Sequence, residues 1–206
     1  MDSLSLKLEK IVDNAIDEFI CKDRVLLQRN LSERALCGAL MKRIYDVLAS
    51  KGYEKFKDYF VDVEFNRQSI YITDSYVNAQ KKYIYNEEII EIFTDIIVHG
   101  RGVLDSCLPD NLIVIEMKRK PYGIGDKNSK YNLLKDKDFK RLQYLTLNEK
   151  ELQNTKDYKA LDDKESLVAY DYQLGVFVEI NYKNPRIDYS IFRHGEKYGE
   201  PISKPF

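Results

Sequence analysis

Apolar residues recur every three or four positions in two stretches near the start of the chain, the spacing that lines one face of a helix. The first stretch, Leu4 to Phe19, predicts an N-terminal amphipathic helix within residues 1–22. Its apolar stripe can pack on the rest of the chain or on a second copy, which would make a homodimer. A second helix is predicted to begin near Ser32, which suits an N-cap, and to end at Ala49, before Gly52.

The hydrophobic period then shortens toward two, as in strands whose side chains alternate between the faces of a sheet. Segments rich in Ile, Val and aromatic residues predict strands at Tyr59–Phe65, Ile89–Val98, Asn111–Met117, Val168–Ile180 and Ile187–Phe192. A helix is expected from Asp136 or Asp138 to Glu149, followed by a polar connector to Glu165. This order predicts an α/β or α+β sandwich, and without a dividing linker residues 1–206 are expected to form a single domain.

Composition narrows the class of protein. The chain has 206 residues, 44% hydrophobic and 33% charged, which supplies the core of an ordinary domain. No apolar run approaches the ~20 residues that span a bilayer, so no membrane partner is expected. Three cysteines at irregular spacing suit a reducing compartment better than a disulfide framework. We therefore expect a soluble cytoplasmic protein.

The segment from Asn111 to Lys118 ends a predicted buried strand with charged residues. Four consecutive aliphatic residues precede Glu116, Met117 and Lys118, and alternation sets Glu116 and Lys118 on one face. Ionised groups beside a core cost desolvation energy unless they are paired or bind something. A cation held by Glu116, with the Lys118 ammonium beside it, would explain the pattern. An acid two positions before a lysine occurs four times, about as often as chance predicts, but only here at such a strand.

Asp95 adds a second strand carboxylate. It interrupts the preceding apolar segment, which could pair with the Glu116 strand as a hairpin. Two carboxylates from neighbouring strands could share a divalent ion, and hard oxygen ligands without a Cys/His cluster favour Mg²⁺ or Mn²⁺ over Zn²⁺. The alternative is that Asp95 caps a strand and that Glu116 forms a partly exposed ion pair with Lys118.

These charged residues follow the order of a known motif. Glu33 lies near the start of a helix, Asp95 on a strand and Glu116-Met117-Lys118 on the next, with a basic helix and another strand to follow. Over roughly residues 32–181 the chain resembles the PD-(D/E)xK nuclease superfamily, departing from its motif at Thr94, where proline is preferred. The resemblance implies a single-domain restriction-endonuclease-like fold, with a central mixed sheet flanked by helices.

The resemblance also implies a metal-dependent nuclease that hydrolyses phosphodiester bonds of nucleic acid, with DNA favoured by analogy. Asp95 and Glu116 would ligate Mg²⁺ or Mn²⁺, with the backbone carbonyl of Met117 as third ligand. Lys118 would position or help to deprotonate the attacking water, and Glu33 would hold a second metal ion or an outer water. A catalytically inactive nucleic-acid-binding or protein-interaction module of the same fold is the alternative. A globular protein with coincidental charges is the third interpretation.

Basic residues concentrate beside this proposed site. From Lys118 to Arg141 there are nine basic and three acidic residues, a local charge of +6 in a chain whose net charge is -1. Such a patch binds phosphates without reading sequence, whereas solvated surface lysines are the plainer explanation. The residues expected to contact nucleic acid are Arg119, Lys120, Lys127, Lys130, Lys137, Lys140 and Arg141.

Overall fold

The computed structural model describes residues 3–65, 67–72, 75–85, 88–102, 107–120, 129–160 and 167–206. Its helices are α1 (Ser3–Lys22), α2 (Arg24–Gln28), α3 (Glu33–Leu48), α4 (Ser129–Leu145), α5 (Glu149–Asn154) and α6 (Lys156–Ala160), with a 3₁₀ turn at Glu54–Phe56. Its strands are β1 (Phe60–Phe65), β2 (Arg67–Ile72), β3 (Ser75–Gln80), β4 (Lys82–Tyr85), β5 (Glu88–Glu91), β6 (Thr94–His99), β7 (Asn111–Lys120), β8 (Leu174–Asn181), β9 (Arg186–Arg193) and β10 (Glu196–Pro205).

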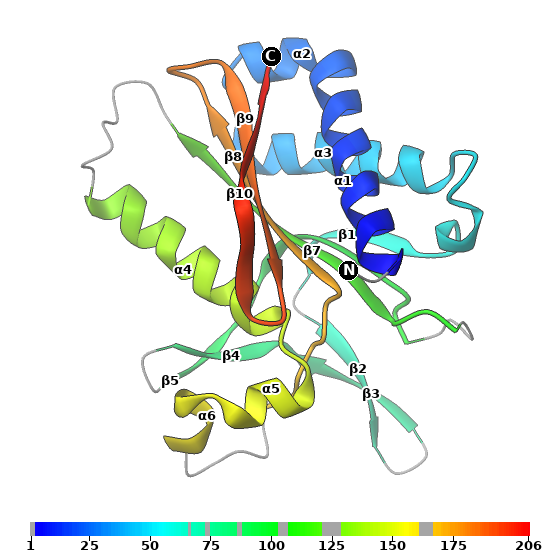
Figure 1. Ribbon diagram of the computed structural model, residues 1–206, viewed down its shortest axis with the longest axis vertical. Helices are drawn as coiled ribbons and strands as arrows, with labels where there is room; N and C mark the ends of the chain where they lie inside the picture. The colour runs from blue at the N-terminus through cyan, green and yellow to red at the C-terminus, as the bar shows by residue number, and fades with distance from the viewer. Residues whose placement is uncertain are drawn as a thin grey trace.

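A six-stranded mixed sheet forms the centre of the molecule, in the strand order β1-β6-β7-β8-β9-β10 (Figure 1). β7 and β8 are parallel, and the other neighbouring pairs are antiparallel. A parallel pair requires a crossover connection, and the chain between β7 and β8 contains α4, α5 and α6. β2 pairs with β3, and β4 with β5, outside this sheet. The prediction of an α+β protein with a mixed sheet flanked by helices is confirmed at this level.

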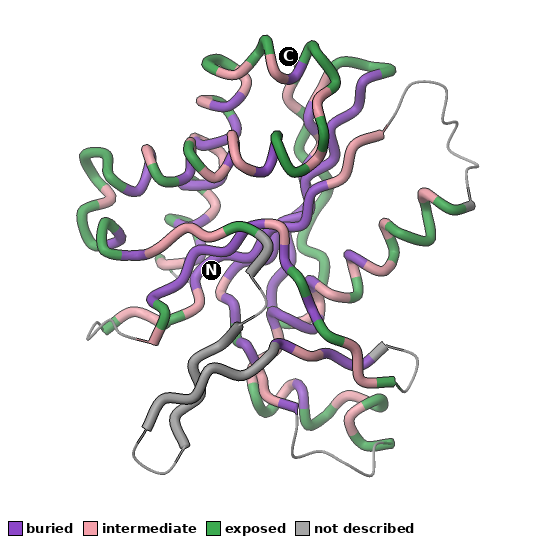
Figure 2. The backbone as a smooth tube through the Cα atoms, turned by 180° about the vertical axis from the view of Figure 1, so that it is seen from behind, coloured by how far each residue is buried: buried purple, intermediate pink, exposed green. Residues whose placement is uncertain are grey.

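Helices cover both faces of the sheet. α1 and α3 pack on one face, where the buried strand residues include Ile115 and Val178. α4 packs on the opposite face, where Leu142 shares a core with Val114 and Phe177. Successive strand residues enter opposite cores because side chains alternate along a strand. The central strands are therefore buried over most of their length, as the purple segments of Figure 2 show.

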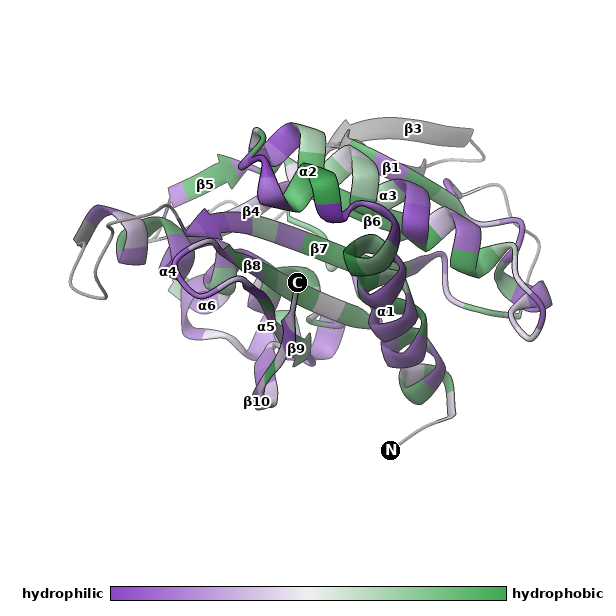
Figure 3. Cartoon of the chain, turned by 90° about the horizontal axis from the view of Figure 1, so that it is seen from above, coloured by the Kyte–Doolittle hydropathy of each residue, from purple (hydrophilic) through white to green (hydrophobic). Residues whose placement is uncertain are grey.

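Helix α1 buries its apolar stripe inside the chain. Leu8, Ile11, Ile16 and Phe19 are each 0% exposed, although hydrophobic and hydrophilic positions share the helix (Figure 3). Burying a side chain of this size contributes about 1.5–3 kcal/mol, so the stripe stabilises the core. The stripe therefore packs on the rest of this chain, the first of the two alternatives, and a homodimer through this helix stays a prediction. None of the helices in the described ranges is long and apolar enough to cross a membrane.

The prediction of one strand from Ile89 to Val98 is wrong, because two strands, β5 and β6, occupy this stretch. β5 pairs with β4, whereas β6 belongs to the main sheet. Between them Ile92 is fully buried in the core beneath α4, and its N–H donates to the Lys81 carbonyl at 2.8 Å. The chain thus passes from pairing with β4 to pairing in the main sheet at this buried residue. Helix α4 begins at Ser129, earlier than predicted, and α5 and α6 occupy most of the expected connector.

A buried lysine lies near the C-terminal end of β6. Lys81 is 1% exposed, and its Nζ donates to the Tyr172 hydroxyl at 2.5 Å. Burial lowers the pKa of Lys81 to about 7, although Asp110 and Asp62 act in the opposite direction. Burial also lowers the pKa of nearby His99, whose Nε2 lies 2.8 Å from Asp62 Oδ2. The charged form of Lys81 therefore costs the folded state free energy at neutral pH.

We expect the free energy of unfolding to rise with pH between about 7 and 10 through Lys81, by up to about 1.4 kcal/mol per pH unit. The unfolded lysine keeps the ordinary pKa of 10.5, so over this range the unfolded chain binds more protons at this site than the folded chain. The Lys81→Met variant, which has no ammonium at this position, should lack this increment. Urea denaturation of both proteins across this range measures it, and parallel profiles would contradict the expectation.

Candidate functional site

Asp95 and Glu116 lie across from each other on neighbouring strands. The antiparallel register of β6 and β7 pairs Ile97 with Val114, and continuing this register by two positions sets Asp95 opposite Glu116. Directly opposed residues of such a pair have Cβ atoms about 4.5–5.5 Å apart. Ile97 and Val114 both belong to the core beneath α4, so the two carboxylates share the sheet face that α4 covers.

Arg141 of α4 neutralises Glu116 inside the protein. Glu116 is 1% exposed, and Arg141 Nη1 donates to its Oε1 at 2.8 Å. Burial raises the pKa of Glu116, an effect that Arg141 opposes and that Asp95 and Asp138 reinforce. The alternative interpretation, a partly exposed ion pair between Glu116 and Lys118, is wrong, because Arg141 of α4 pairs with this buried carboxylate.

Asp95 is bound to the backbone of the next strand. Its Oδ2 accepts a hydrogen bond from the Met117 N–H at 2.7 Å. Burial raises the pKa of the Asp95 carboxyl, which the Met117 N–H and the Lys118 ammonium oppose. Asp95 therefore does more than end a strand, because it links β6 to the residue between Glu116 and Lys118.

The Lys118 ammonium lies among three oxygen atoms. Its Nζ is 3.3 Å from Glu33 Oε1, 3.2 Å from Asp138 Oδ2 and 3.2 Å from the Met117 carbonyl oxygen. Burial acts to lower the pKa of Lys118, but Asp138 and Glu33 outweigh it and raise the pKa. At neutral pH this side chain is an ammonium, which suits it to hold an anion or a water rather than to remove a proton.

Glu33 reaches the site from the first turn of α3. Ser32 caps this helix, with its Oγ accepting from the Ala35 N–H, as the sequence predicts. Besides Lys118, the Glu33 carboxylate binds the Arg119 N–H through Oε2 at 3.1 Å. The carboxylate thus ties the start of α3 to β7, and the end of β7 holds Lys118 within its reach.

These residues form a cluster, the β7–α4 charge cluster, in which carboxylates outnumber cations. Its members are Glu33, Asp95, Glu116, Asp138, Lys118 and Arg141. Four carboxylates against two cations give a formal charge of -2 when all are ionised. Burial raises the pKa values of Asp95, Glu116 and Asp138, and the neighbouring carboxylates raise them further. Such an excess is stabilised by protonation or by a bound dication.

The oxygen atoms of this cluster are of the chemical type that binds hard dications. They are carboxylate and carbonyl oxygens, the ligands that Mg²⁺ and Mn²⁺ prefer, and the sequence singled out Asp95, Glu116 and the Met117 carbonyl. Within the described residues, no group of three or more His, Cys, Asp or Glu side chains is close enough together to hold a metal ion. A dication here would therefore use two carboxylates and backbone or water oxygens.

The basic segment divides between internal and surface roles. Arg119 Nη1 binds the Asn30 carbonyl, the Asn30 Oδ1 and the Leu31 carbonyl at 2.7–3.2 Å, so this guanidinium holds the turn before α3. Arg119 and Arg141 therefore both bind partners within the chain, and their contact with nucleic acid stays a prediction. Lys130 and Lys140 are exposed on α4, and Lys120 and Lys137 are partly buried. Lys127 lies outside the described residues.

Asp138 is the site residue that the sequence pattern did not single out. It is 3% exposed and binds Lys118 on one side and Arg141 on the other. It lies four positions before Leu142 and seven before Leu145, both fully buried, which is the spacing of one helix face. That spacing was a readable signal that Asp138 points toward the sheet.

Comparison of the chain with protein-family models, with curated proteins and with solved structures finds no match.

Replacing Arg141 with Gln should lower the free energy of unfolding by about 3–5 kcal/mol, because it leaves the buried Glu116 without its cation. The double variant Arg141→Gln/Glu116→Gln should recover much of this loss, since two neutral amides replace the ion pair. Lys42→Gln, which removes an exposed α3 ion pair with Asp46, serves as the control and should change stability little. Urea denaturation measures all three, and a single variant as stable as the double variant would contradict the expectation.

Proposed function

We propose that this chain is a divalent-metal-dependent nuclease with a restriction-endonuclease-like fold, hydrolysing phosphodiester bonds of nucleic acid, with DNA as the favoured substrate. The observation that carries the proposal is the uncompensated charge of the β7–α4 charge cluster, beside an ammonium held in place. Carboxylates of this kind destabilise a fold unless a bound cation offsets them. Carboxylates in excess over cations, with perturbed pKa values, are typical of a functional site that binds an ion.

The order of elements supports the fold assignment. A helix with Glu33 in its first turn precedes an antiparallel pair with Asp95 on one strand and Glu116 and Lys118 on the other. A helical crossover then leads to a parallel neighbour, β8. These features agree with the arrangement that the sequence resemblance implies, and function is argued from the site because fold alone does not determine it.

Asp95, Glu116 and the Met117 carbonyl would hold Mg²⁺ or Mn²⁺. The ion would supply Lewis-acid activation of water and charge neutralisation at the phosphate. The Lys118 ammonium would bind a phosphate oxygen and stabilise the negative charge that builds on it during displacement. Asp138 and Glu33 are the residues that position this ammonium.

Arg141 supports the same chemistry indirectly. Burial raises the pKa of Glu116, and Arg141 opposes this effect, so the guanidinium favours the ionised carboxylate that a metal ligand needs to be. Arg141 therefore positions and charges a ligand, without itself needing to reach the substrate.

Cleavage of nucleic acid is the direct test. Incubated with plasmid, single-stranded DNA or RNA in Mg²⁺ or Mn²⁺, the protein should cleave at least one of them. Lys118→Ala should lower the rate by about 10²–10³-fold, because it removes one charge that stabilises the transition state. Lys42→Ala, which removes an α3 lysine paired with Asp46, should leave the rate unchanged. Salt-sensitive binding without cleavage would instead favour the inactive binding module, and neither activity would reject both functions.

Metal binding should also change the free energy of unfolding. Asp95→Asn should raise the free energy of unfolding in EDTA, because burial raises the pKa of the carboxyl it replaces. Mg²⁺ at a hundred times its Kd should stabilise the parent by about 2.7 kcal/mol and this variant far less. Thermal denaturation with and without Mg²⁺ measures both effects.

Asp62→Asn is the matched control for this measurement. Arg101 and His99 lower the pKa of Asp62 against the effect of its burial, so this substitution should destabilise the protein and leave the Mg²⁺ response intact. An equal Mg²⁺ response in the parent and in Asp95→Asn would contradict metal binding at Asp95.

A further inference from the structure

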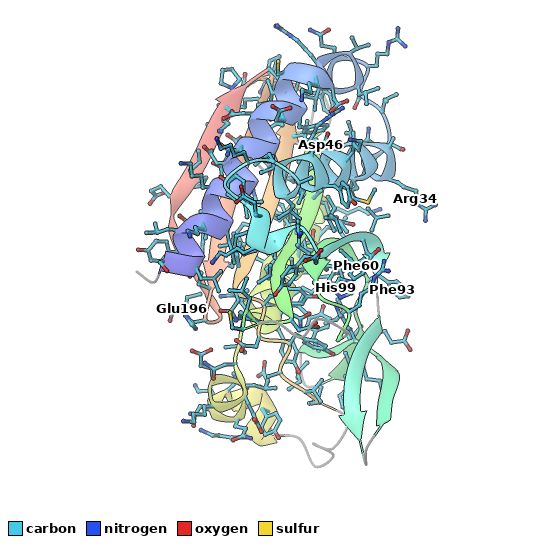
Figure 4. All side chains as sticks on the ribbon, turned by 90° about the vertical axis from the view of Figure 1, so that its right-hand side faces the viewer. Arg34, Asp46, Phe60, Phe93, His99 and Glu196 are labelled. Atoms are coloured by element: carbon cyan, nitrogen blue, oxygen red, sulfur yellow. The ribbon has the colours of Figure 1, made fainter. Side chains whose placement is uncertain are left out.

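One exposed aromatic residue adjoins the β7–α4 charge cluster. Phe93 immediately precedes β6, two positions before Asp95, and is 58% exposed, the largest fraction among the large apolar residues that the structure describes. Figure 4 shows it on the same side of the molecule as Arg34, the residue that follows Glu33 on α3. Phe93, two positions before Asp95, and Arg34, next to Glu33, are therefore exposed on one side of the protein.

The backbone of Phe93 is anchored although its ring is exposed. Ile92 before it is 0% exposed and Thr94 after it is 1% exposed, so both neighbours are buried. Arg141 Nη1 donates to the Phe93 carbonyl at 3.2 Å and to Glu116 at 2.8 Å. One guanidinium thus holds both the predicted metal ligand and the residue that carries the exposed ring, which sets the ring at a constant place relative to the site.

A single exposed apolar side chain is common on protein surfaces and by itself needs no explanation. What distinguishes Phe93 is its rigid position beside a cluster with excess negative charge. Without a bound dication such a cluster repels the phosphates of a nucleic-acid strand, so attraction that does not depend on charge would strengthen binding next to it. A phenyl ring provides this attraction by stacking on the face of a base, whatever the base.

Stacking of this kind favours single-stranded over duplex nucleic acid. Bases inside a duplex are already stacked and paired, and moving one out costs a few kcal/mol. An unpaired base offers its face without that cost. We propose that Phe93 stacks on an unpaired base of the strand under attack, and that the site therefore takes single-stranded nucleic acid. This inference rests on the proposed nuclease function.

Binding without turnover tests the inference. Fluorescence anisotropy in EDTA compares a labelled single-stranded oligothymidylate with a duplex of the same length, so no cleavage consumes the probe. Phe93→Ala should weaken single-strand binding by about 5- to 150-fold and leave duplex binding unchanged. Phe93→Tyr, which keeps an aromatic ring, should retain the affinity, and Phe93→Leu, which keeps only the apolar surface, should lose it.

Tyr45→Ala is the matched control, because Tyr45 is 54% exposed on α3 and lies outside the cluster. Single-strand binding that is equally weak in Tyr45→Ala and Phe93→Ala, or fully retained in Phe93→Leu, would overturn the stacking role. So would a parent protein that cleaves only duplex, and in these cases the nuclease assignment stands if cleavage depends on Lys118. A parent that neither binds nor cleaves nucleic acid would overturn both.

Discussion

The buried ion pair between Arg141 and Glu116 is the interaction on which the rest of the site depends. It joins α4 to β7 across the core, and it opposes the effect of burial, which raises the pKa of Glu116. Apolar residues of the same size would often stabilise the fold at least as well, so the pair is weak evidence of a purely structural role. The same guanidinium binds the Phe93 carbonyl, so one side chain orders both the interior of the site and its border.

Around this pair the protein keeps more negative charge than it neutralises. Lys118 forms ion pairs with both Glu33 and Asp138. Asp95 accepts a hydrogen bond from the Met117 N–H. A cluster so arranged costs free energy in the free protein, and the binding of a cation would remove that cost. The large cores on the two faces of the sheet offset this local cost.

The sequence predicted well where local pattern and tertiary packing act together. The helix from Ser32, the strand that ends at Glu116 and Lys118, and its antiparallel neighbour with Asp95 all appear, because strong periodicity marks a buried face. It failed where strand pairing, rather than hydrophobic periodicity, decides the element. The break at Ile92 depends on pairing of β5 with β4, and β10 depends on the edge that β9 offers to a segment of mixed polar residues.

By itself the sequence determined which residue types stand at the ends of the strands, and hence that carboxylates and an ammonium accompany a buried sheet. Only the tertiary structure decided their partners. Arg141 and Arg119, which composition groups with surface lysines, bind inside the chain, and Asp138 joins the site from a helix. The reason is physical: the net charge of a segment is a sum over the chain, whereas the pairing of each charge follows from distance and burial, which exist only once the helix packs on the sheet.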